Sequence, residues 1–170
     1  MTRSFRLLLP GLALVLHLSC SGGSGGSASS GNTRHEMPDC GIALELPSHF
    51  GQPTHGTGCA YDWTGNGGMT LLSVTAALPG DPGNETDPAT AMPGQVVDYA
   101  RDATFGGLPG KERRTQQKVG EQNRAVWTGF FQGPKGALNI KVATIQKESA
   151  DEFGEQFWQN IRSRWVHALK

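Results

Sequence analysis

The chain has 170 residues, the length of one ordinary domain. Its 15 lysine and arginine residues balance its 15 aspartate and glutamate residues, so it lacks the broad positive field with which proteins neutralise nucleic-acid phosphates. We therefore exclude DNA and RNA as partners. The 36% hydrophobic content, with many glycines and prolines, predicts a loop-rich folded domain and not a chain that is disordered throughout.

The N-terminal segment has the pattern of an export signal. Arg3 and Arg6 precede an apolar run over residues 7–18. A helix needs about 20 apolar residues to cross a bilayer, and this run is shorter. It therefore predicts a cleavable signal peptide over residues 1–19 and not a retained transmembrane anchor.

The end of this run identifies the type of signal. The residues His17-Leu18-Ser19-Cys20 resemble a bacterial lipobox, in which the cysteine is lipidated and becomes the first residue of the mature protein. His17 departs from the pattern, which normally has an aliphatic residue there, and Leu16 compensates in part. The resemblance implies lipidation of Cys20, a membrane contact through the N-terminal lipid, and a lipid-anchored location in the bacterial cell envelope. The alternative is a soluble secreted protein with a chance cysteine.

A polar segment follows the lipobox. Residues 21–31 are serine and glycine with a single alanine, so they have no side chain able to offset the entropy of ordering. We expect residues 20–37 to comprise the lipidated cysteine and a flexible Ser/Gly tether, and residues 38–170 to form a single α+β globular domain. Ser21 after Cys20 resembles lipoproteins that are sent to the outer membrane.

Two cysteines remain once Cys20 is assigned to the lipid. Cys40 and Cys59 form an even pair in an oxidising compartment, which predicts a disulfide. Closing a loop of about 20 residues stabilises a domain by about 3 kcal/mol in the chain-entropy model. The alternative is a zinc site that also uses His49 and His55. The chain has no Cys-x-x-Cys pair there, and these residues lie in a Gly/Pro-rich loop, so we predict no metal.

The first half of the domain predicts three strands and a helix. Apolar residues alternate over residues 42–46, which indicates a strand. Residues 59–64 and 69–77 flank Gly65-Asn66-Gly67-Gly68, a turn sequence typical of a β-hairpin. From about Gln95, the apolar residues Val96, Tyr99, Ala100 and Ala103 share one helical face, and Gly106-Gly107 supplies a helix stop.

The second half predicts a meander and a final helix. Strands are expected over residues 112–119, 124–132 and 137–146, separated by two turns rich in glycine and polar residues. Ser149 and Glu152 have the spacing of a capping box. The helix after them has an apolar stripe that we expect to cover the sheet, formed by Phe153, Phe157, Ile161, Trp165 and Leu169.

This order of six strands, with one helix after the third and another after the sixth, resembles the PsbP-like fold, which also occurs in bacterial lipoproteins of the DcrB type. The likeness extends over residues 41–170 and includes the opening Gly-Ile-Ala-Leu-Glu-Leu-Pro, the segment Ala125-Val126-Trp127 and the Phe/Trp-rich final helix. It implies an α+β fold, with an antiparallel sheet of about six strands flanked by two helices in an α/β/α sandwich. The resemblance also implies a scaffold used mainly for binding and assembly.

No sequence motif points to catalysis. The chain has no Gly-x-Ser-x-Gly elbow, no His-Glu-x-x-His and no Walker loop, and His35, His49, His55 and His167 lie in no recognisable setting. We expect no cofactor and no enzymatic activity. The prediction is an accessory or assembly component of a cell-envelope machine, such as one for secretion, motility or surface attachment, with envelope proteins as partners.

Two alternatives stay open. One is a small-ligand or metal-binding lipoprotein, whose apolar pocket would be lined by Trp63 or Trp127. The other is an enzyme whose site is assembled from residues distant in sequence.

Overall fold

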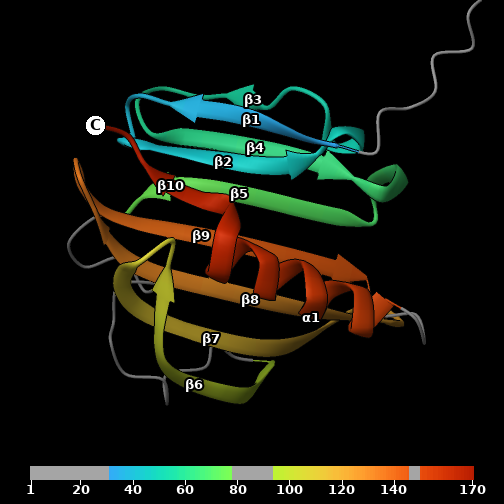
Figure 1. Cartoon of the computed structure of the whole chain (residues 1–170). Helices are drawn as coiled ribbons and strands as arrows, with labels where there is room; N and C mark the ends of the chain where they lie inside the picture. The colour runs from blue at the N-terminus through green and yellow to red at the C-terminus, as the bar shows by residue number, and fades with distance from the viewer. Residues whose placement is uncertain (1–30, 78–93, 146–149) are drawn as a thin grey trace, which may run out of the picture.

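The computed structural model describes residues 31–77, 94–145 and 150–170 (Figure 1). Its elements in chain order are β1 (Asn32–Met37), β2 (Ile42–Pro47), η1 (Ser48–Phe50), β3 (Thr54–His55), β4 (Ala60–Gly65), η2 (Asn66–Gly68), β5 (Thr70–Ala76), β6 (Gln95–Phe105), β7 (Leu108–Val119), β8 (Gln122–Gly133), β9 (Gly136–Ile145), α1 (Ala150–Asn160), η3 (Ile161–Trp165) and β10 (Val166–Ala168).

The larger sheet has seven strands in the order β3-β4-β5-β9-β8-β7-β6. Each neighbouring pair is antiparallel, and the predicted hairpin β4–β5 and the meander β7–β8–β9 are both confirmed. Asn66 and Gly67 have positive φ angles of 51° and 63°, the conformation that the Asn-Gly turn was expected to supply. Because side chains alternate between the two faces of a strand, this register sends Trp63, Leu72 and Val142 to one face together.

The smaller sheet has three strands in the order β1-β2-β10. β1 pairs with β2 from Asn32 opposite Pro47, and β10 pairs with the other edge of β2 with Val166 opposite Leu44. β1 lies at the end of residues 20–37, the segment that the sequence predicts to be the lipidated cysteine and tether. Residues 32–37 are therefore part of the folded domain.

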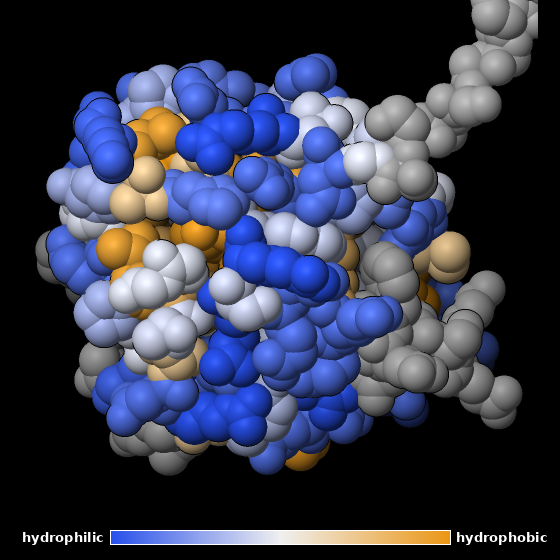
Figure 2. All heavy atoms as spheres, in the orientation of Figure 1, coloured by the Kyte–Doolittle hydropathy of each residue, from blue (hydrophilic) through white to orange (hydrophobic). Residues whose placement is uncertain are grey.

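The smaller sheet and α1 cover the same face of the larger sheet, as Figure 1 shows. Ile42, Leu44 and Leu46 of β2 are fully buried in the core that these layers share. Aromatic rings join the layers: Phe50 of η1 stacks on Phe157 of α1 at 5.1 Å between ring centroids, and Phe105 of β6 meets Trp158 of α1 edge-on at 5.7 Å. We call the opposite face of the larger sheet the outer face; it points away from the viewer in Figure 1 and in Figure 2.

The predicted fold class was wrong in its elements. In place of one sheet of about six strands flanked by two helices, the structure has sheets of seven and three strands, and the described residues contain one α-helix. The helix expected from Gln95 is strand β6. A β-bulge between Val97 and Tyr99 shifts the alternation of side chains, so that apolar residues before and after it take a spacing that resembles a helical face. Gly106 and Gly107, with φ angles of 57° and 86°, turn the chain into β7 and do not end a helix.

The C-terminal helix is shorter than predicted. α1 ends at Asn160, a π-helical turn η3 follows, and the chain then becomes β10. Phe157, Ile161 and Trp165 of the expected stripe are buried. Ser149 and the side chain of Glu152, the predicted capping box, lie outside the described residues. Within the described part of the chain, no helix is long and apolar enough to cross a membrane.

Candidate functional site

Cys40 and Cys59 are joined by a disulfide, with 4.9 Å between their Cα atoms. It connects the turn after β1 to the segment before β4, so it joins the smaller sheet to the larger one. With both sulfur atoms bonded to each other, neither is free to act as a thiolate ligand in the alternative zinc site. Among the described residues, no three histidine, cysteine, aspartate or glutamate side chains gather as a metal site would require. Cys20 lies outside the described residues.

The four histidines considered as bases or ligands are dispersed. His35 is buried with its ring edge-on to Trp63 at 5.6 Å, and burial lowers its pKa. His49 lies against Phe50, and His55 stacks on Tyr61. His167 is on β10, with Nε2 3.3 Å from a carboxylate oxygen of Glu45. They do not form a joint site.

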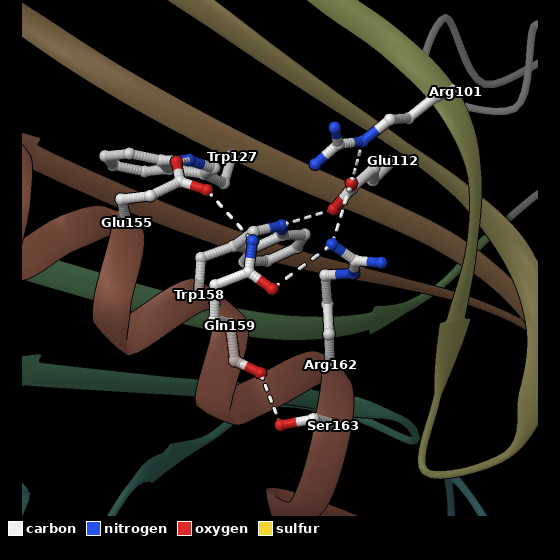
Figure 3. Close-up of polar contacts among 8 residues, drawn as sticks. All are labelled: Arg101, Glu112, Trp127, Glu155, Trp158, Gln159, Arg162 and Ser163. Carbon is white, nitrogen blue, oxygen red and sulfur yellow. Dashed lines mark hydrogen bonds and ion pairs between the residues drawn. The ribbon is translucent and has the colours of Figure 1, made fainter.

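Within the described residues, a buried polar cluster surrounds Glu112 of β7, whose side chain is 0% exposed (Figure 3). Arg101 Nε of β6 donates to Oε1 at 2.6 Å, and Arg162 Nη1 of η3 lies 3.0 Å from the same oxygen. Trp158 Nε1 of α1 donates to the other oxygen, Oε2, at 2.6 Å. One carboxylate therefore joins an edge strand, its neighbour and the helical segment.

A second carboxylate continues this polar cluster along α1. Trp127 Nε1 of β8 donates to Glu155 Oε2 at 2.9 Å, and Gln159 Nε2 donates to Glu155 Oε1 at 3.0 Å. Gln159 in turn accepts from Arg162 Nη1 at 3.4 Å. Figure 3 shows these side chains between the helix and the sheet.

Tyr99 of β6 borders the cluster. Burial, together with the negative charges of Glu155 and Glu112, raises its pKa to about 12. The Arg101 guanidinium lies 4.5 Å from the centre of the Tyr99 ring, and its hydrogen bond to Glu112 raises the pKa of Arg101. Both oxygens of Glu112 are occupied by donors, so the arrangement is that of a structural brace, with no free base directed at a substrate.

The outer face of the larger sheet contains a groove of about 350 Å³. Asp62, Ser73 and Lys141 lie in one row across β4, β5 and β9, and Leu71 at the rim is 42% exposed. The complete lining is Asp62, Trp63, Thr64, Leu71, Leu72, Ser73, Gln117, Arg124, Val126, Lys141 and Ala143.

The groove differs from the pocket expected from the sequence. Trp63 contributes to its lining, but the Trp63 side chain is 2% exposed and belongs to the core. Trp127 is fully buried on the face toward α1. The lining contains neither histidine nor cysteine, so its chemistry is that of mixed apolar and charged contact.

Sequence reasoning did not find the Glu112 cluster. Glu112 lies in the run Lys111-Glu112-Arg113-Arg114, which has the composition of an exposed strand. One signal was present: a tryptophan on the buried face of a helix, such as Trp158, needs an acceptor for its indole N–H. Its partner is 46 residues away in the chain and could not be identified from spacing.

No protein-family model matches the chain, and the comparison with curated protein sequences found no match. Among solved structures, cyanobacterial PsbP (CyanoP) from Synechocystis matches with a TM-score of 0.55 at 14% identity, covering 87% of this chain and 98% of CyanoP. The Saccharomyces cerevisiae Ran-binding protein Mog1p matches with a TM-score of 0.52 at 9% identity, covering 84% and 97%. The chain therefore has a PsbP-like fold, in agreement with the resemblance noted in its sequence.

Proposed function

We propose that this protein is a lipid-anchored envelope protein without enzymatic activity, which acts as an accessory or interaction component of a larger envelope assembly. The lipobox-like sequence at Cys20 and the Ser/Gly segment after it support the anchor. Mog1p, which shares the fold, is a Ran-binding protein, so the fold is compatible with binding another protein. Fold likeness by itself does not define a function.

The observation that carries the proposal is the outer-face groove. Apolar groups from Leu71, Val126 and Ala143 lie beside the charges of Arg124 and Lys141. Protein interfaces likewise combine apolar contact surface with polar and charged groups. Of the elements in the described residues, α1 and the smaller sheet cover the other face, which leaves the groove accessible to a partner.

The ionisable groups of the described residues support a binding role over a catalytic one. An active site needs titratable groups that converge on a cavity. The most deeply buried carboxylate, Glu112, is occupied by three donors on the face away from the groove. The groove itself is lined by one carboxylate, Asp62, and two cationic groups.

Small-ligand binding is the second candidate function. The groove volume of about 350 Å³ favours it, because pockets for small molecules begin at about 300 Å³. Native mass spectrometry of the purified full chain distinguishes this function, since a retained small molecule would add a defined mass.

The test is an affinity pull-down of the epitope-tagged, membrane-extracted full chain, followed by mass spectrometry of the bound proteins. Cys20→Ala tests the anchor. Asp62→Lys combined with Lys141→Glu reverses both charges in the central row of the groove, and Lys135→Glu in the β8–β9 turn is the matched control. We expect an envelope protein that is lost with the groove variant and kept with the control. A partner that the groove variant retains would refute binding at this groove.

A further inference from the structure

The exposed apolar side chains gather at one end of the larger sheet. Among the residues whose side chains are described, the large apolar ones that are exposed are Met69 (45%), Leu71 (42%), Val96 (65%) and Val119 (46%). One row of backbone pairs crosses the sheet there, from Thr70 through Thr144, Ala125 and Gln116 to Val96. Met69 and Val119 extend beyond this row, and Leu71 lies just inside it. We call this the tethered end, for the reason that follows.

The N-terminal segment joins the fold at this same end. β1 begins at Asn32, opposite Pro47 at the end of β2, and Ser48 N donates to Gly31 O at 3.3 Å. Phe50, two residues after Ser48, packs directly on Gly65 at the β4–β5 turn. Figure 1 shows the start of β1, the β4–β5 turn and the end of β9 on the same side of the molecule.

The opposite end carries none of these four side chains. It holds the β8–β9 turn, where Lys135 packs beside Gly41. The last strand also finishes there, with Leu169 N donating to Gly41 O at 2.9 Å. The two ends therefore differ in exposed apolar surface, and the end with more of it is the end from which the chain runs back toward Cys20.

We propose that the tethered end docks on the lipid surface that holds the anchor, with Met69 and Val119 entering the interface. Single exposed apolar residues are normal on a protein surface. Here they lie together at the end of the domain where the segment with the proposed lipid joins the fold, and this placement needs an explanation. A chain of the length and composition of residues 21–31 spans about 20 Å, so the lipid keeps this end close to the headgroups. The inference rests on the proposed lipid anchor at Cys20.

The charges beside Val119 fit an anionic lipid surface. Lys118 and Arg124 flank the β7–β8 turn, and Glu121 is the acidic residue within it. Basic side chains near a membrane are attracted to anionic headgroups, while the apolar side chains enter the headgroup boundary. Contact through a few side chains would orient the domain and leave the outer-face groove beside the membrane.

The experiment uses the lipidated full chain reconstituted in vesicles of phosphatidylglycerol and phosphatidylethanolamine. Met69→Cys provides the thiol for an environment-sensitive fluorophore, because Cys40 and Cys59 are bonded to each other and the sulfur of Cys20 carries the proposed lipid. Val119→Cys is a second probe of the same end, and Lys135→Cys is the control at the opposite end. We expect emission from the first two probes to shift to shorter wavelength and to be quenched by lipids bearing a nitroxide, with neither change at position 135.

The outcomes separate this inference from the proposed anchor. Vesicle flotation with equal quenching at positions 69, 119 and 135 would overturn docking and leave the anchor standing. A chain that does not float and has no acyl mass on Cys20 would overturn both. Crosslinking between two copies through position 69, without lipid quenching, would make this end a protein interface instead. Adding Leu71→Asp and Val119→Asp to the labelled Met69→Cys chain should reduce quenching at position 69. Flotation should not change, because the lipid on Cys20 still holds the chain on the vesicle.

Discussion

Replacing Glu112 by glutamine removes one buried charge while keeping the size of the side chain. Glu112 is 0% exposed and accepts from Arg101 and Trp158 at 2.6 Å, with Arg162 at 3.0 Å. The glutamine retains one acceptor oxygen, but its amide group brings two donors to a position already surrounded by donors. At least one of these three groups is therefore left without an acceptor.

The loss in the free energy of unfolding depends on how exposed each of the three partners is. Arg101 is 52% exposed and can return to water, whereas Arg162 is 20% exposed and Trp158 is fully buried. Hydrogen bonds to charged groups contribute about 1.5–3 kcal/mol, and breaking a buried ion pair costs about 3–5 kcal/mol. We expect Glu112→Gln to reduce the free energy of unfolding by about 2–4 kcal/mol.

Urea unfolding followed by tryptophan fluorescence measures this change. Glu36→Gln is the matched control: its pair with Arg34 spans 3.5 Å between two exposed side chains, and such pairs contribute about 0–1 kcal/mol. A double-mutant cycle with Trp158→Phe isolates the indole contribution. If Glu112→Gln costs no more than the control, the cluster is not a brace and the reasoning from burial is wrong.

Three further predictions concern the disulfide and two titratable side chains. Replacing Cys40 and Cys59 by serine should lower stability by about 3 kcal/mol in urea unfolding, and dithiothreitol should have no such effect on that variant. An ultraviolet titration should show a tyrosine with a pKa of about 12, and Tyr99→Phe should remove this ionisation. Because the pKa is raised in the folded state, the free energy of unfolding should fall as the pH rises from 10 to 12. A single tyrosine ionisation near pH 10 would contradict this prediction. Burial lowers the pKa of His35 in the folded state, so that the unfolded chain takes up this proton at a higher pH than the folded chain. The free energy of unfolding should therefore fall as the pH is lowered below 6.5. Unfolding experiments should find a weaker dependence on acid in His35→Leu.

The sequence predicted the elements whose pattern is local. The alternation in residues 42–46 and the Asn-Gly turn correspond to β2 and the β4–β5 hairpin. The spacing of Phe157, Ile161 and Trp165 identified the buried side of the final helical segment. These features depend on residues that are close to one another in the sequence.

The errors arose where tertiary pairing decides the structure. β6 pairs with β7 through a bulge, which broke the two-residue alternation and produced an apparent helical face at Tyr99 and Ala103. The strand β1 is polar and short, with His35 and Met37 as its buried residues, and its pairing with β2 is not visible in its composition. Residues 166–168 form the strand β10, and do not continue the helix, because they pair with the edge of β2.

The position of Glu112 explains why a buried charge serves this fold. β6 is an edge strand with one neighbour, β7, so a second attachment to the helical segment restrains it. Arg101 and Arg162 supply that attachment through the shared carboxylate, and Gly106 N of the β6–β7 turn donates to Arg162 O at 3.0 Å. All of these contacts lie on the face toward α1. A Glu112 variant that remains folded should therefore keep the outer-face groove and the tethered end intact, which separates loss of stability from loss of binding.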